Sequence, residues 1–355
     1  MPLVDVLKAA ASQLIVLHHL AAYGPMSEVV YEHAPGLFDW LYYNARTAVQ
    51  IFLVVGGFLA TRTLAPHGVA AIASPGALLW RRYCRLALPL FAAILLSIGS
   101  AAVARAWMEH DFVPAAPSLA QFAAHALLLH DILGHEALSA GVWYVAIDFQ
   151  LFGLLVASLW LARELSGALM AAWGAPLLIL LLAVASLFYF NRDPGWDAWA
   201  LYFFAAYALG TLAYWAGNRT HSPLWLTALA AFALLAVVVD FRPRLLVALA
   251  VALALGIACR TQLFERWPAA SWVSFLARIS YSVFLVHFPV CMLINAAVFR
   301  FFQADLTANV LGLLIAWSAS IGAGWLLYYL VERRTDRLVA ARYLRTRTRT
   351  AVASS

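Results

Sequence analysis

The chain of 355 residues is 65% hydrophobic and only 11% charged, with a formal net charge of +6. A soluble globular protein is usually about 45–50% apolar and about 25% charged, so this composition excludes the soluble classes and indicates a polytopic membrane protein. Arginines at the ends of apolar segments explain the positive charge better than nucleic-acid binding does. The three cysteines have no motif spacing, so we predict that they form neither a disulfide framework nor a metal site.

Apolar runs long enough to cross about 30 Å of hydrocarbon recur along the whole chain. We expect about ten, at roughly 6–23, 47–64, 86–106, 142–162, 168–190, 197–216, 223–240, 244–259, 272–298 and 306–331. The segment 118–132 is too short to span the membrane, and we expect a short interfacial or re-entrant helix there. The predicted fold is an all-α polytopic bundle, with one membrane domain over 1–335 and a basic cytoplasmic tail over 336–355 that we expect to be disordered.

The loop arginines predict the orientation of the bundle. Placing both termini in the cytoplasm puts most of the arginines inside, as the positive-inside rule requires. The region 107–141, which has no Lys or Arg, then faces outward. Six arginines remain outside in this orientation: Arg46, Arg105, Arg192, Arg242, Arg244 and Arg300.

The first apolar segment carries three ionisable residues, Lys8, His18 and His19. A charge near the centre of a span costs roughly 2.5–3.5 kcal/mol, so such residues indicate function by default. Lys8 and His19 are eleven positions apart, which is about 16 Å along a helix and about 20° around it. The two side chains therefore share one helix face, whereas His18 points about 100° away. A purely structural alternative is that the Lys8 ammonium extends to the lipid headgroups and one histidine forms a hydrogen bond with a neighbouring helix.

Three later stretches also carry chemistry. Arg81, Arg82 and Arg85 precede the third span and could grip phosphates through forked hydrogen bonds, although the positive-inside rule alone predicts a basic cluster there. Asp148 lies near the start of the fourth span. It could orient a histidine, or it could simply be exposed at the N-terminus of its own helix, where the helix dipole favours a carboxylate. His287 lies in the ninth span, two residues before Pro289, and could serve catalysis or only an interhelical hydrogen bond.

Six segments resemble, in order, the motifs of the acyltransferase family 3 membrane proteins. Residues 4–11 followed by His19 resemble the family's L-D-G-L-R-A-L-A opening, in which an Arg or Lys precedes a histidine by about three turns. The other matches are at 44–59 (V-D-L-F-F-V-L-S-G-F-L), 81–89 (R-R-x-x-R-I-x-P), 143–150 (W-S-L-S-V-E-x-Q), 280–289 (S-Y-x-x-Y-L-x-H-x-P) and 328–333 (V-E-R/K-P). Three departures are Gly56 for Ser, Lys8 for Arg and Asp148 for Glu.

The resemblance implies an integral O-acyltransferase of the bacterial inner membrane. It implies transfer of an acyl group, most simply acetyl, from cytoplasmic acyl-CoA to a hydroxyl of a carbohydrate or glycolipid. No tightly bound cofactor is implied, because acyl-CoA is a co-substrate. By this resemblance His19 is the catalytic histidine and Lys8 its paired cation, and we expect Asp148 to orient the imidazole. We expect Arg81, Arg82 and Arg85 to bind the coenzyme A phosphates, and Trp143 and His287 to contact the substrate.

Two other classes of function remain open at this point. A proton-coupled transporter could use Lys8, His19, Asp148 and His287 as a relay, although no inverted repeat supports it. An outward metal site could use His110, His125, His130 and His135. The five-residue spacings of the last three turn successive side chains by about 140°, so one helix face cannot gather them.

Overall fold

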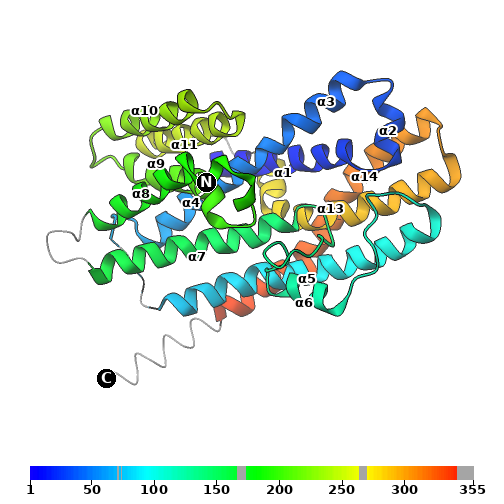
Figure 1. Ribbon diagram of the computed structural model, residues 1–355, viewed down its shortest axis with the longest axis horizontal. Helices are drawn as coiled ribbons and strands as arrows, with labels where there is room; N and C mark the ends of the chain where they lie inside the picture. The colour runs from blue at the N-terminus through cyan, green and yellow to red at the C-terminus, as the bar shows by residue number, and fades with distance from the viewer. Residues whose placement is uncertain (70–71, 73, 166–172, 264–269, 342–355) are drawn as a thin grey trace. The chain divides into compact units, whose positions relative to one another are not determined.

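The computed structural model describes residues 1–69, 72, 74–165, 173–263 and 270–341. These residues form helices and turns, with no strand among them, and Figure 1 traces them from α1 in blue to α14 in orange. The main helices are α1 (Pro2–Ala22), α2 (Pro25–Tyr31), α3 (Pro35–Tyr43), α4 (Val49–Leu64), α5 (Pro75–Trp107), α6 (Leu119–Ala126), α7 (Val142–Leu165), α8 (Gly174–Phe188), α9 (Ala200–Ala216), α10 (Leu224–Val239), α11 (Pro243–Thr261), α13 (Ser271–Phe302) and α14 (Leu306–Leu327).

The all-α membrane fold predicted from the sequence is confirmed. Among the described residues, eight helical stretches are long and apolar enough to cross a membrane, and α9 and α10 are shorter apolar helices. Together they correspond to the ten predicted spans. The predicted span 168–190 begins among residues outside the described part, and α8 starts at Gly174.

Two boundaries differ from the sequence prediction. The predicted helix over 118–132 is only α6, which ends at Ala126 because Leu128 adopts a left-handed conformation (φ 59°). At the other end of the chain, a π-helical turn, η4 (Tyr328–Glu332), follows α14, and the helix then continues through Ala341. The predicted tail boundary at 336 therefore lies inside a helix, and residues 342–355 of that tail lie outside the described residues.

The described chain divides into two compact units. The first contains residues 1–15, 43–76 and 146–278, and the second contains residues 16–42, 77–145 and 279–355. Each unit is therefore built from segments that are distant in the sequence.

In the first unit, α4 and α9 pack backbone against backbone. A Cβ atom on Gly57 would lie 1.9 Å from the carbonyl oxygen of Tyr207, and one on Gly210 would lie 1.9 Å from that of Val54. Thr61 Oγ1 donates to Thr211 Oγ1 across the same interface over 3.0 Å. Small residues with interhelical hydrogen bonds are the usual way to join helices in lipid, where apolar side chains gain little from association. Helices α8 and α11 also pack on α9 (Figure 1).

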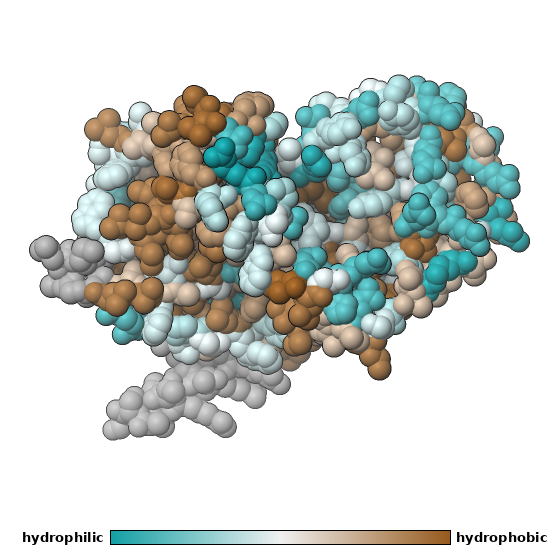
Figure 2. Space-filling model, viewed as in Figure 1, coloured by the Kyte–Doolittle hydropathy of each residue, from teal (hydrophilic) through white to brown (hydrophobic). Residues whose placement is uncertain are grey.

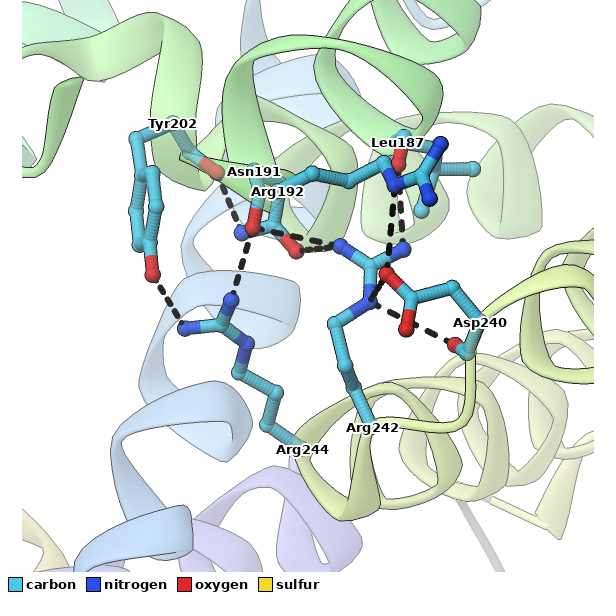
Figure 3. Close-up of polar contacts among 7 residues, drawn as sticks. All are labelled: Leu187, Asn191, Arg192, Tyr202, Asp240, Arg242 and Arg244. Carbon is cyan, nitrogen blue, oxygen red and sulfur yellow. Dashed lines mark hydrogen bonds and ion pairs between the residues drawn. The ribbon is translucent and has the colours of Figure 1, made fainter. Parts of the chain in front are cut away.

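A polar cluster joins the end of α8 to α9 and to the start of α11 (Figure 3). The Arg242 guanidinium donates to the carbonyl oxygen of Leu187 in α8 over 3.0 Å and to Asn191 just beyond that helix. Arg244 donates to the carbonyl oxygen of Asn191 over 2.8 Å and to the Tyr202 hydroxyl over 2.7 Å. Since the last carbonyls of a helix lack intrahelical partners, Arg242 satisfies one at the C-terminal end of α8, and Arg244 satisfies a carbonyl in the turn η2 (Phe190–Arg192) that follows. Two of the six arginines that the predicted orientation leaves outside therefore have structural partners.

The surface of α8 and α10 is apolar. On the face shown in Figure 2, hydrophobic side chains gather over these helices. Exposed members of the two helices are Leu177, Leu181, Leu234, Leu235 and Val238. An exposed apolar surface of this kind suits contact with lipid, in agreement with the membrane class.

In the second unit, α2 packs on α14 and is held at its start by α13. The backbone N–H of Met26 donates to Asn295 Oδ1 over 3.0 Å. Gly24, which ends the turn after α1, has φ 95°, and a Cβ atom there would lie 2.5 Å from Asn295 Oδ1. Tyr281 Oη donates to the carbonyl oxygen of Leu86 over 2.8 Å and so joins α13 to α5. These contacts place the end of α1, which carries His18 and His19, in the same unit as α13, which carries His287.

Candidate functional site

His19 and His287 are hydrogen-bonded to each other in the second unit. Nδ1 of His19 lies 2.6 Å from Nε2 of His287. The side chains are buried, with 9% and 1% of their surface exposed. On the other side of His287, Nδ1 lies 2.7 Å from the carbonyl oxygen of Phe284. The two imidazoles and the backbone carbonyl of Phe284 thus form a buried polar network.

Aromatic side chains border this pair. The Tyr23 ring lies 5.5 Å from the His19 ring, one helical turn along the chain, and 5.4 Å from the Phe288 ring, edge to face. Phe112 approaches both Tyr23 and Phe288, with centroids 6.5 and 6.2 Å away. Sites for organic ligands are mostly lined by apolar and aromatic side chains with a few polar groups. His19 and His287 are the polar groups of this cluster.

His18 has a different environment from its neighbour. Its Nδ1 lies 3.2 Å from the carbonyl oxygen of Leu41, and its ring lies 5.7 Å from that of Tyr42. The hydrogen-bond partners of the two histidines differ, although their rings are in contact, with centroids 5.0 Å apart. Substitution of His18 therefore shows how much of the effect at His19 comes from this ring contact.

Ring contacts link Trp143 to Phe284, which lies one turn before His287. The Trp143 ring lies 6.2 Å from that of Tyr144, and the Tyr144 ring lies 5.5 Å from that of Phe284. Gly141, with φ 82°, lets the preceding loop approach the same Phe284 ring, where a Cβ atom would lie 2.8 Å from Cζ. The predicted contact of Trp143 with the substrate stays a prediction.

The three predicted phosphate-binding arginines lie on α5 in the second unit. Arg85 Nε donates to Asp336 Oδ1 over 2.7 Å, with both side chains about half exposed. The Nε atom of Arg82 is buried. Next to them, Trp80 stacks on Tyr83, whose hydroxyl donates to the carbonyl oxygen of Ala126 over 2.8 Å.

Lys8 and Asp148 belong to the first unit. Helix α1 includes both Lys8 and His19, so the helical spacing on which their pairing rests is present. Asp148 is buried, and a Cβ atom on Gly56 would lie 4.0 Å from its Oδ1 and 3.1 Å from Tyr207 Cε2. A serine at 56, the residue in the family motif, would thus stand beside this carboxylate. The predicted roles of Lys8 and Asp148 toward His19 stay predictions.

The histidines of the region 107–141 include a stacked pair, His125 and His130, with ring centroids 4.2 Å apart. Nδ1 of His125 lies 2.8 Å from the carbonyl oxygen of Gln121, and Nε2 accepts from the backbone N–H of Leu138 over 3.1 Å. Both ring nitrogens of His125 are therefore occupied. His110 instead lies 3.0 Å from Glu28. Within the described ranges, no group of three or more His, Cys, Asp or Glu side chains is arranged to hold a metal ion.

Several residues of this site were not predicted from the sequence. They are Tyr23, Phe112 and Asn295, none of which the sequence analysis singled out. The spacing of His19 and Tyr23, four residues apart on one helix, is the signal that could have found the first of them. No local pattern pointed to Phe112 or Asn295.

Comparison with known proteins gives one match. A family model for acyltransferase family 3, described as an acyltransferase domain, matches residues 2–329, nearly the whole chain. The search of curated proteins and the search of solved structures found no match. The matched range includes the histidine pair, the aromatic cluster and the arginines of α5.

Proposed function

This chain belongs to acyltransferase family 3, and from that membership we propose an O-acyltransferase that moves an acyl group, most simply acetyl, from acyl-CoA to a hydroxyl of a carbohydrate or glycolipid. Membership in the family and the apolar helices establish a multi-pass membrane acyltransferase. The observation that supports the finer proposal is the buried, hydrogen-bonded imidazole of His19 inside an aromatic cluster. Such a group is suited to take a proton from a hydroxyl at neutral pH.

In the proposed reaction His19 is the general base. Its imidazole accepts the proton of the acceptor hydroxyl while the oxygen attacks the thioester carbonyl. The C–S bond breaks, an ester C–O bond forms, and the thiolate of coenzyme A takes the proton from the imidazolium. We propose direct transfer because the sequence has no Ser or Cys motif of the kind that pairs a nucleophile with a base.

The acyl donor is proposed to bind through the arginines of α5. Arg82 and Arg85 would hold the phosphates of coenzyme A, with Arg81 beside them, because guanidinium groups pair with phosphate in a forked geometry. This places the donor phosphates at the cytoplasmic side if both termini are cytoplasmic, as the loop arginines predict. Cysteine labelling at Ser118 with a membrane-impermeant reagent on intact cells tests that orientation. Failure of position 118 to label would contradict it.

The function is tested by substituting the two neighbouring histidines. His19→Ala should lower acyl transfer by about 10²–10⁴-fold, the usual contribution of a positioned general base. His18→Ala should lose far less, because its Nδ1 partner is the carbonyl oxygen of Leu41 and it touches His19 only by a ring contact, with centroids 5.0 Å apart. Purified variants are assayed for transfer from radiolabelled acetyl-CoA, with thermal stability measured alongside.

A stable and active His19→Ala protein would overturn this mechanism. Transport activity that needs no acyl-CoA, together with no acyl transfer by the wild type, would instead favour the proton-coupled transporter. Mass spectrometry of surface glycans from cells with and without the protein then identifies the acceptor.

A further inference from the structure

We propose that His287 is a positioning residue that fixes the tautomer of His19, so that Nε2 of His19 is the basic nitrogen. This inference rests on the proposed function, in which His19 is the general base. It assigns to His287 a role different from the substrate contact expected from the sequence.

The carbonyl oxygen of Phe284 determines where His287 carries its proton. A carbonyl only accepts hydrogen bonds, so Nδ1 of His287, 2.7 Å away, must be the N–H donor. A neutral imidazole has one N–H group, and its other nitrogen is an acceptor. Nε2 of His287 is therefore the acceptor in the 2.6 Å bond with His19.

The proton of His19 is located in the same way, by its bond to His287. Because His287 Nε2 accepts, Nδ1 of His19 must donate. The single N–H of a neutral His19 is thereby used at Nδ1, and the lone pair is left on Nε2. Both rings are neutral in this arrangement, which avoids the cost of a charge within a membrane span.

The relative orientation of the rings fits this hydrogen bond. Their planes are 6° apart and their centroids 4.7 Å apart. The 2.6 Å separation of the nitrogens is well below the roughly 3.5 Å at which ring faces stack. The rings therefore meet edge to edge, with the bond nearly in both planes, as a lone pair on a ring nitrogen requires.

The surroundings hold His287 in this position. Its side chain is 1% exposed, and the Phe284 ring beside it packs against Tyr144 and against Gly141. An acceptor held so rigidly favours one tautomer of its partner before any substrate arrives. When His19 takes up a proton at Nε2, its Nδ1–H bond to His287 becomes charge-assisted and therefore stronger. The interaction thus stabilises the transition state more than the ground state, which raises kcat.

Two substitutions at 287 separate acceptor chemistry from packing. His287→Gln can present Oε1 as an acceptor, whereas His287→Met has similar length and no good acceptor. We expect His287→Met to lower kcat at least tenfold with little change in the KM for acetyl-CoA, and His287→Gln to retain most of the rate. His33→Gln, at an exposed histidine just after α2, is the matched control and should behave as wild type. Thermal stability is measured for all three variants.

The tautomer is read directly by ¹⁵N NMR of histidine-labelled protein in detergent, with the His19 signals identified from their loss in His19→Ala. The attached proton should be on Nδ1 in the wild type and in His287→Gln, and should leave Nδ1 in His287→Met. A His19 that keeps its Nδ1 proton in His287→Met would overturn the inference, as would an unchanged kcat in that variant. If His19→Ala is active, the proposed function fails, but the NMR measurement still decides whether His287 fixes the tautomer.

Discussion

Arg85 on α5 donates from Nε to Oδ1 of Asp336, over 2.7 Å. The pair joins positions 251 residues apart in the sequence, and both side chains are about half exposed. Asp336 therefore occupies one edge of a guanidinium that we propose for a phosphate of coenzyme A. A phosphate must either displace this carboxylate or bind the other edge of the same group.

The variant Asp336→Asn should bind acyl-CoA more tightly, because the competing negative charge is gone. An exposed ion pair is worth about 0.2–1 kcal/mol, so the gain in affinity should be at most about fivefold. Isothermal titration of purified protein with acetyl-CoA measures it. A weaker affinity would mean that Asp336 helps to position Arg85 instead of competing for it.

Replacing both Arg82 and Arg85 with Lys should weaken acyl-CoA binding although the charge is kept. An ammonium group is a point charge and cannot reproduce the bidentate geometry of a guanidinium. Arg105→Lys, near the other end of α5, is the matched control and should bind as wild type does. If the double variant keeps the wild-type affinity, the cluster serves membrane orientation alone.

Acid should destabilise the region that follows α5, through His125 and His130. Burial lowers the pKa of each imidazole from 6.5 to about 4. Between these pH values the unfolded chain binds protons that the folded chain does not. The free energy of unfolding is therefore highest above about pH 6.5 and decreases as the pH falls towards 4. The melting temperature in detergent should therefore drop as the pH falls through this window.

The matched variant for this effect is His130→Phe, which keeps a flat ring beside His125 and removes one titrating group. Nε2 of His130 lies 3.4 Å from Asp131 Oδ2, and neither ring nitrogen forms a hydrogen bond within the described chain, so His130→Phe loses only this longer contact at neutral pH. Its melting temperature should depend less steeply on pH than that of the wild type. Equal slopes for the two proteins would show that other groups cause the acid sensitivity.

The membrane helices could be predicted from the sequence because hydrocarbon imposes a length and an apolar composition on each span. The end of α6 could not, since Leu128 takes a left-handed conformation with no Gly or Asn to signal it. Likewise, the sequence indicates only topology charges at Arg242 and Arg244, whereas in the structure they bond carbonyl groups of Leu187 at the end of α8 and of Asn191 in the turn after it. Hydrogen-bond partners that come from another helix leave no local trace.

In the candidate site, too, the partner of a residue that the sequence indicates could not be predicted. His19 was singled out because an ionisable group is costly in an apolar span and because the family spacing matched. Its partner His287 lies 268 positions away, and both were recognised only as separate histidines. Periodicity tells which face of a helix a residue occupies, but tertiary packing decides which faces meet.

The close approach of α4 and α9 at Gly57 and Gly210 gives the sharpest test of the packing. A Cβ atom at either position would lie 1.9 Å from a backbone carbonyl oxygen of the other helix, so α4 and α9 would have to move apart. Overpacking of this kind typically costs about 1–3 kcal/mol, and Gly57→Ala and Gly210→Ala should both lower the melting temperature clearly. Gly99→Ala is the control, because nothing lies within 4 Å of its Cβ position and Ala is the better helix former. A Gly57→Ala protein as stable as Gly99→Ala would contradict the close approach of the two helices.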